Sequence, residues 1–287
     1  MPEIELSQQK VFSGLTFLSA KPQLKRCKNS LVQLYSGASK ETTKQIGSGV
    51  LIKLNEYHFL ITCAHVLNQV KAETLLTFIK GRDESVQLNG ESVCPPEIES
   101  EKYQNDLDLG FVILEEKVVN TLKPDCVFLE KSDIEINHGK PDKGFYISYG
   151  FPKKRTHQYG KDIRAKLYGF TASYINNVTG DWPDLNIKSH FLFGLKNKVS
   201  YVDKGKAKTP DPDGMSGGAV FYLQGNIAHP NQMRMTLIGF NMDYKLDSSE
   251  QRRVCRAIRI DYVLELIASE VQDLSLIDKN IQRKILK

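Results

Sequence analysis

Short apolar segments separated by turn residues are the feature of this chain that most restricts the folds open to it. They are rich in β-branched and aromatic residues, which favour strands, and each is bounded by Gly, Asn, Asp or Pro. They lie at 30–35, 48–53, 57–62, 76–79, 109–114, 144–149, 219–223 and 235–240. Many short strands with turns between them predict antiparallel barrels or a sandwich rather than βαβ units.

Two segments have the pattern of helices rather than strands. The first covers about residues 7–18. The second follows the apolar segment 257–260, where Asp261 can cap a new helix. Its apolar residues recur at helical spacing, at Val263, Leu264, Leu266, Ile267 and Val271. We therefore expect a mainly β protein with a helix near its C-terminus.

The chain length and one polar stretch indicate two halves. A chain of 287 residues can form one large domain or two smaller ones that share an interface. The polar stretch 115–142, which holds Pro124 and Pro141, is the best candidate for a connection. The resulting division has an N-terminal extension at 1–28, a first β-barrel at 29–120, a linker at 121–142, a second β-barrel at 143–260, and a C-terminal helix and tail at 261–287.

Composition places the chain among soluble globular proteins and argues against several partners. Apolar residues make up 40% and charged residues 25%, near the averages for folded domains. The 39 basic residues are interleaved with 34 acidic ones and form only short runs such as Lys153-Lys154-Arg155. A nucleic-acid partner is therefore not expected, since such partners select clustered charge. Without a signal-peptide core or a long apolar run, we expect no membrane partner and a cytoplasmic location.

The five cysteines give no sign of a disulfide framework or a zinc site. Their number is odd and no two have CxxC spacing. They are Cys27, Cys63, Cys94, Cys126 and Cys255. A reducing compartment suits them best, and the sequence assigns no metal ligands.

One serine lies inside a glycine-rich turn, in the sequence Gly214-Met-Ser-Gly-Gly218. A serine hydroxyl is a weak nucleophile at neutral pH and needs an adjacent base to take its proton. Residues without Cβ let the chain turn sharply and bring amide N–H groups close to a substrate carbonyl. We therefore interpret Ser216 as a nucleophile and the amides of Gly214 and Ser216 as an oxyanion hole. The alternative is a tight surface turn.

Two upstream residues complete this chemistry. His65 follows the apolar segment 59–62 and begins a short helical turn, so packed neighbours would fix the orientation of its ring. The base needs a carboxylate on its other ring nitrogen, and both Asp106 and Asp108 are placed to supply it. Asp108 is favoured because it directly precedes the apolar segment 109–114, whereas Asp106 would face solvent.

Other candidate side chains near this chemistry are given structural roles. Cys63, two residues before His65, is interpreted as a small buried thiol rather than a second nucleophile. A core histidine with no catalytic role is the alternative for His65. The remaining histidines have no ligand-like spacing, at His58, His138, His157, His190 and His229.

Taken in order, the three segments resemble the signatures of trypsin-like serine peptidases of the chymotrypsin fold. They are Thr62-Cys-Ala-His65, Asp108-Leu-Gly-Phe-Val and Gly214-Met-Ser-Gly-Gly218, and the roles given above follow the triad of that family. The resemblance covers about residues 30–270. Further segments resemble its bacterial, HtrA-type branch, namely Gly47-Ser-Gly-Val-Leu-Ile52, Tyr146-Ile-Ser-Tyr-Gly-Phe-Pro152, and Leu237-Ile-Gly-Phe-Asn241 followed by Ala257-Ile-Arg-Ile-Asp261.

The resemblance implies an all-β fold of two six-stranded antiparallel barrels with a C-terminal helix and an active site in the cleft between the barrels. It implies a serine endopeptidase that cleaves protein or peptide substrates through an acyl-enzyme intermediate and needs no cofactor. It places Asn241, Met242 and Asp243 in the wall of the substrate pocket. Asp211, Asp213 or Asp243 would attract a basic substrate side chain, unless they are turn aspartates that face water.

Two departures from the family pattern change this expectation. Met215 precedes the serine where secreted trypsins carry an aspartate, so activation by a newly cut N-terminus is not expected. After Asp261 only a helix and a short basic tail follow, so the peptide-binding PDZ domain of the HtrA type is not expected either. Two alternatives to a freely active peptidase stay open. One is a latent enzyme that awaits a regulatory protein partner or ligand, and the other is a catalytically silent module that binds a peptide or protein.

Overall fold

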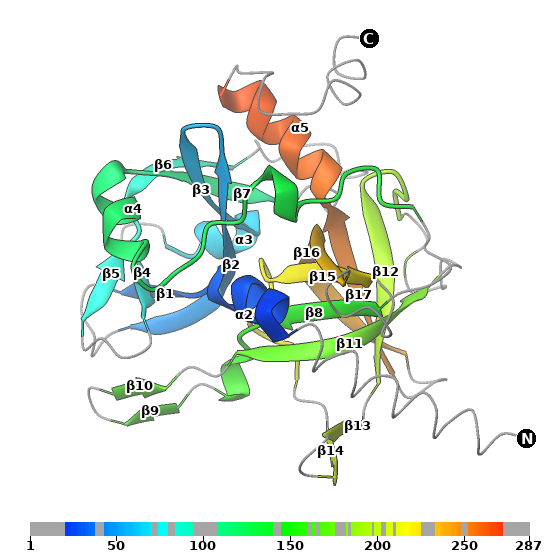
Figure 1. Ribbon diagram of the computed structural model, residues 1–287. Helices are drawn as coiled ribbons and strands as arrows, with labels where there is room; N and C mark the ends of the chain where they lie inside the picture. The colour runs from blue at the N-terminus through cyan, green and yellow to red at the C-terminus, as the bar shows by residue number, and fades with distance from the viewer. Residues whose placement is uncertain are drawn as a thin grey trace, which may run out of the picture.

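The structure is a computed structural model of the chain. It describes residues 21–37, 43–70, 74–79, 84–94, 108–139, 145–155, 157–159, 162–164, 167–175, 182, 185–196, 198–201, 205–208, 211–224, 233–247 and 252–271. The helix predicted over 7–18 lies outside these residues. The described chain forms two antiparallel β-units, the first on the left of Figure 1 and the second on the right.

The first unit is a sheet of seven antiparallel strands in the order β5-β4-β1-β2-β3-β7-β6. Nearly every residue of its central strands is buried, and Phe59 and Phe111 are completely buried. β2 and β3 are joined by a tight turn in which Asn55 has a φ of +51°, a conformation that asparagine tolerates well. The strands are β1 (Leu31–Gly37), β2 (Lys44–Leu54), β3 (Tyr57–Thr62), β4 (Thr74–Phe78), β5 (Ser85–Gln87), β6 (Gly90–Val93) and β7 (Gly110–Leu114).

The second unit is a closed barrel in the order β11-β12-β17-β16-β15-β8. Its interior is rich in aromatic side chains, among them Tyr146, Phe191, Phe193 and Tyr222. The barrel strands are β8 (Phe145–Gly150), β11 (Tyr168–Ile175), β12 (His190–Lys196), β15 (Ala219–Gln224), β16 (Arg234–Asp247) and β17 (Arg252–Arg259). Two separate hairpins lie outside the barrel, β9 (His157–Tyr159) with β10 (Asp162–Arg164), and β13 (Lys198–Tyr201) with β14 (Gly205–Lys208).

This architecture confirms the predicted all-β fold of two barrel-like units. The first unit differs in detail, because its described strands form a seven-stranded sheet where a six-stranded barrel was expected. Five of its strands correspond to predicted segments, and the other two are β5 and β6, which are three and four residues long and lie at the two edges of the sheet. Both contain polar residues, so the apolar pattern that marks the central strands does not reveal them.

The predicted C-terminal helix is confirmed as α5 (Ile260–Val271), which buries Ile260, Val263, Leu264 and Ile267. Asp261 does not cap it, because the helix begins one residue earlier and the Asp261 carboxylate accepts from the backbone N–H of Asn137. A helix that the strand pattern did not predict, α2 (Lys21–Asn29), lies within the segment assigned as an N-terminal extension. None of the helices in the described residues is both long and apolar enough to cross a bilayer. The shorter helices are α3 (Ala64–Leu67), α4 (Glu116–Leu122), η1 (Lys131–Asp133) and η2 (Lys153–Arg155).

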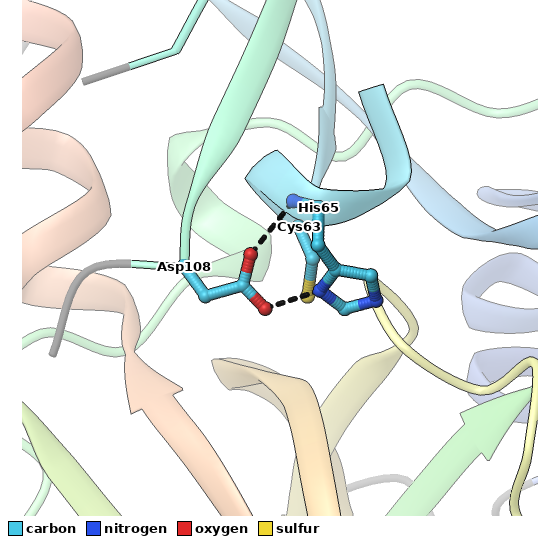
Figure 2. A group of neighbouring side chains, drawn as sticks. All are labelled: Cys63, His65 and Asp108. Carbon is cyan, nitrogen blue, oxygen red and sulfur yellow. Dashed lines mark hydrogen bonds and ion pairs between the residues drawn. The ribbon is translucent and has the colours of Figure 1, made fainter. Parts of the chain in front are cut away.

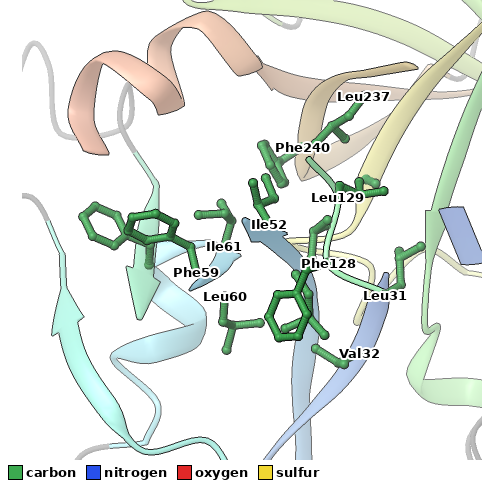
Figure 3. Close-up of a cluster of buried hydrophobic side chains, with 14 of the residues drawn as sticks. Leu31, Val32, Ile52, Phe59, Leu60, Ile61, Phe128, Leu129, Leu237 and Phe240 are labelled. Carbon is green, nitrogen blue, oxygen red and sulfur yellow. The ribbon is translucent and has the colours of Figure 1, made fainter. Parts of the chain in front are cut away.

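The connection between the two units is packed against both of them. α4 buries Val118, Val119 and Leu122. Further along, Leu129 forms a parallel bridge with Ile52 of the first unit, and Ile134 forms one with Leu237 of the second. One cluster of buried apolar side chains, drawn in part in Figure 3, runs from β2 and β3 to Leu237 and Phe240 of β16. This shared core fixes the end of β3 close to β16 and to the loop that holds Ser216.

Candidate active site

His65 and Asp108 meet at the ends of two adjacent strands. His65 lies in α3, three residues after the end of β3, and Asp108 lies two residues before the start of β7. Because β3 and β7 pair with Thr62 opposite Gly110, the two side chains lie at the same edge of the sheet. The Nδ1 atom of His65 is hydrogen-bonded to Oδ2 of Asp108, and the backbone N–H of His65 donates to Oδ1 at 2.8 Å (Figure 2).

Gly110 allows α3 to approach this closely. A Cβ at position 110 would lie 2.8 Å from Cδ1 of Leu67 and 3.3 Å from Cα of Ala64. Val66 and Leu67 of α3 are buried, whereas the side chain of His65, directly before them, is 46% exposed. The helical turn is thus anchored by its apolar neighbours while the ring faces the cleft.

The Asp108 carboxyl is held in its charged form. Burial raises its pKa, but the hydrogen bonds and the charge of His65 lower it further, so that its pKa lies below the ordinary value. These hydrogen bonds come from the ring and the backbone N–H of His65, one to each carboxylate oxygen. The alternative acid, Asp106, lies outside the described residues.

The Ser216 loop is shaped by two glycines with positive φ. Gly214 has a φ of +93° and Gly217 a φ of +80°, in a region where side chains with a Cβ are strained. Met215 between them is only 3% exposed and packs in the core of the second barrel. An apolar side chain thus anchors this loop at the position where secreted trypsins carry an aspartate.

Hydrogen bonds to two carbonyls set the direction of the Gly214 and Ser216 amides. Asp213 O accepts from Lys153 N at 2.8 Å, and Met215 O accepts from Gly218 N at 2.8 Å. In a trans peptide the C=O and the following N–H point in opposite directions, and the described chain has no cis peptide. The N–H groups of Gly214 and Ser216 therefore point away from these donors. No described backbone carbonyl accepts from either group, so both are available to a negatively charged oxygen.

Ser48 of β2 supports the same loop from the first unit. Its backbone N–H donates to Ser216 O at 2.9 Å and its hydroxyl donates to Gly214 O at 2.8 Å. The same hydroxyl accepts from Phe151 N at 3.0 Å, and the residue is completely buried. Sequence reasoning gave Ser48 no role of its own, although a serine between two glycines directly before the apolar run 50–52 was a usable signal.

The Ser216 hydroxyl donates to Met242 O at 2.8 Å. No hydrogen bond joins it to His65 among the described residues, although both side chains line one cavity. Met242 lies at a register shift between β16 and β17, where Asn241 pairs with Ala257 and Asp243 with Arg256. Its carbonyl thus lies at an irregularity in the strand pairing. The proton of the Ser216 hydroxyl is thus directed at this carbonyl and not at the histidine ring.

The cavity beside Ser216 has a volume of about 200 Å³ and brings together all three residues predicted to wall the substrate pocket. Met242 contributes a buried apolar side chain as well as the carbonyl that binds Ser216. Asn241 has a supporting role, because its side chain donates to Tyr149 O at 3.0 Å and accepts from Ser148 at 3.0 Å. The apolar side chains of Leu195, Met215 and Cys255 complete much of the lining.

Each of the three candidate aspartates is paired with a cation of the protein itself. Lys154 lies 2.8 Å from Asp211, Lys153 lies 3.2 Å from Asp213, and Arg256 makes two hydrogen bonds of 3.0 and 2.9 Å to Asp243. Hydrogen bonds from Lys154 and Tyr244 lower the pKa of Asp211 to about 2. Each of these carboxylates thus already has a cation of the protein as its partner, while the side chains of Asp213 and Asp243 stay 53% and 45% exposed.

Comparison with known proteins adds two distant structural resemblances. No protein-family model matches the sequence, and no curated protein matches it. A solved structure titled "HtrA-type protease AlgW with decapeptide" is 15% identical with a TM-score of 0.48, and the match covers 87% of this chain and 66% of that one. Kallikrein-related peptidase 10 is 14% identical with a TM-score of 0.47, over 85% of this chain and 96% of that one. At these low identities, the chemistry of the site rests on the residues of this chain.

Proposed function

We propose that this protein is a serine endopeptidase. Ser216 attacks the scissile carbonyl while His65 takes its proton as general base, and His65 then returns a proton to the leaving amine. Asp108 fixes the tautomer of the imidazole and stabilises its protonated form. The amides of Gly214 and Ser216 stabilise the oxyanion of the tetrahedral intermediate. Water then releases the acyl group from Ser216 in the same way.

The observation that carries the proposal is that three separate segments meet: His65 and Ser216 line one cavity, and Asp108 is hydrogen-bonded to His65. An ionised Asp108 is hydrogen-bonded to Nδ1 of His65, so the other ring nitrogen is left to act on a proton. Ser216 lines the same cavity as His65, in a loop whose two amides have no described backbone acceptor. A surface turn or a structural histidine would need none of these arrangements. The substrate we propose is a protein or peptide whose side chain enters the cavity.

The contact between Ser216 and Met242 supports a resting state that is not yet competent. A hydroxyl that donates to a carbonyl has its proton engaged away from the base. We propose that a bound substrate or a regulatory partner displaces this contact and lets Ser216 turn toward His65. Such a step would make the enzyme latent until its cleft is occupied.

An activity-based fluorophosphonate probe tests the proposed function. We expect covalent labelling at Ser216, located by mass mapping of the labelled peptide, because only an activated serine attacks the phosphorus rapidly. The His65→Ala variant should lose the labelling, since it lacks the base. Failure to label the protein under any condition would contradict the proposal and favour the silent binding module. Full-rate labelling of the isolated protein, unchanged by added peptides, would contradict latency.

The role of Ser48 gives a further prediction. Ser48→Ala should lower kcat by up to about 10²-fold with little change in KM, because the oxyanion loop loses the hydroxyl that fixes Gly214 O. The unpaired groups it leaves should also lower the free energy of unfolding by about 1–3 kcal/mol. Steady-state kinetics and urea unfolding measure the two effects.

Ser30→Ala is the matched control for Ser48→Ala. Ser30 is equally buried and donates to Cys27 O at 2.8 Å, in the first unit and without contact to the Ser216 loop. It should lower stability to a similar extent and leave kcat unchanged. Equal losses of kcat in the two variants would show that Ser48 acts on stability alone.

A further inference from the structure

Cys63, His65 and Asp108 form a cluster of three different metal-binding groups. The Sγ atom of Cys63, a ring nitrogen of His65 and a carboxylate oxygen of Asp108 all lie within 4.8 Å of one another (Figure 2). It is the one group of three or more such atoms from His, Cys, Asp and Glu found in the described part of the chain. The thiol is buried and donates a hydrogen bond to Asn241 O at 3.3 Å, which it would give up on binding a metal. The mechanism proposed above makes no use of this thiol.

The geometry points to a second function for this cluster: we propose that Cys63, His65 and Asp108 bind a Zn²⁺ ion that reversibly inactivates the site. A thiolate, an imidazole and a carboxylate are a ligand set that zinc accepts in tetrahedral geometry, with water in the fourth position. The charges balance, because one thiolate and one carboxylate match the two charges of the metal. Binding converts the Cys63 S–H into a thiolate and releases that proton to solvent.

The cluster can accept the ion after a small movement of the histidine. Zinc–nitrogen and zinc–oxygen bonds of about 2.0–2.2 Å place two ligand atoms about 3.3 Å apart across a tetrahedral ion. The hydrogen-bonded Nδ1 and Oδ2 atoms therefore have to separate. The Asp108 carboxylate stays oriented by the N–H of His65 at 2.8 Å, while the half-exposed ring is free to shift. The same exposure gives the ion a route from solvent.

Bound metal would remove the base from the proposed reaction, and this part of the inference rests on the proposed function. The metal takes the lone pair of Nδ1, so a neutral ring must then carry its proton on Nε2. A nitrogen that already holds a proton cannot accept one from Ser216. The ion also separates Asp108 from the ring it orients. Zinc binding and catalysis are therefore mutually exclusive.

Metal binding is tested first in the inactive full-length Ser216→Ala variant, with Co²⁺ as a spectroscopic probe for Zn²⁺. We expect one Co²⁺ per chain, displaced by Zn²⁺, with the charge-transfer absorption of a cobalt–thiolate bond. Removing a residue that only supports a metal ligand costs about 10- to 100-fold in metal affinity. Cys63 is a proposed direct ligand, so Cys63→Ser should weaken Co²⁺ binding by at least about tenfold and abolish that absorption. Cys63→Ala, checked for folding by circular dichroism, should do the same.

Cys94 provides the matched control, because its thiol also lies near Asp108 but is not part of the cluster. Cys94→Ser should bind Co²⁺ like its parent. The absence of stoichiometric binding, or a cobalt–thiolate band that survives Cys63→Ser, would overturn the site. This arm needs no activity, so its outcome is independent of whether the protein is a peptidase.

Inhibition is tested in the active protein with the fluorophosphonate probe. Zn²⁺ should suppress labelling of Ser216 and a chelator should restore it, whereas Cys63→Ser should need at least about tenfold more Zn²⁺. Mg²⁺ and Ca²⁺ should have no effect, because these hard ions bind oxygen ligands and not thiolate or imidazole. The inhibition would be refuted if labelling were unchanged at a Zn²⁺ concentration that fully displaces Co²⁺ from the site. That result would leave the metal site itself in place.

Discussion

Ser216→Ala is expected to lower peptide cleavage by roughly 10⁶-fold and to leave the fold intact. The nucleophile of such a triad contributes most of the rate, because its loss disables the other members as well. The fold should survive because, among the described residues, the Ser216 side chain makes one hydrogen bond, to Met242 O, while its backbone carbonyl remains bound by Ser48 N. A proteome-wide cleavage profile of the wild type and the variant measures the effect and identifies the substrates together.

The control for this variant is Ser132→Ala. Ser132 is an exposed residue of η1, and Arg234 contacts its backbone carbonyl rather than its side chain. Its cleavage profile should match that of the wild type. A Ser216→Ala profile that equals both would contradict the assignment of the nucleophile, provided that circular dichroism shows all three proteins folded.

Asp108→Asn is expected to lower kcat by roughly 10⁴-fold with little change in KM. An asparagine keeps the size of the side chain, but its amide group can hold the imidazole in the wrong tautomer and cannot stabilise its protonated form. The loss should be largest at neutral pH, where Asp108 is ionised because its pKa lies below the ordinary value. Kinetics with a peptide substrate identified from the cleavage profile, measured across pH, test this result.

Asp106→Asn separates the two aspartates that the sequence offered. Because only Asp108 is assigned to the histidine, the exchange at 106 should change kcat by less than about threefold, which corresponds to a barrier change of well under 1.4 kcal/mol. If the large loss followed Asp106→Asn instead, the acid would have been assigned to the wrong residue. If both exchanges had equally small effects on kcat, neither carboxylate would take part in the reaction.

Local patterns were enough to predict most of the central strands and the C-terminal helix. The segment 57–62 was predicted with the same limits as β3, because a short run rich in aromatic and β-branched residues between turn residues favours a strand. The helix after residue 260 followed from its apolar spacing. By contrast, β5 and β6 were missed, since short edge strands with polar residues bury too little to leave a pattern. Two longer strands of the closed barrel, β11 and β12, were missed as well.

For the candidate site, the sequence determined which chemical groups are available and the tertiary structure decided how they are oriented. Order and motif named Ser216, His65 and Asp108, because glycine turns and buried strand ends restrict residues within a few positions of one another. The contacts of Ser48 with Gly214 and of Ser216 with Met242 span 166 and 26 residues. The pairing of Asp243 with Arg256 likewise depends on β16 and β17 lying side by side in one barrel. Such contacts depend on the register of paired strands and on packing between the two units, which no local pattern contains.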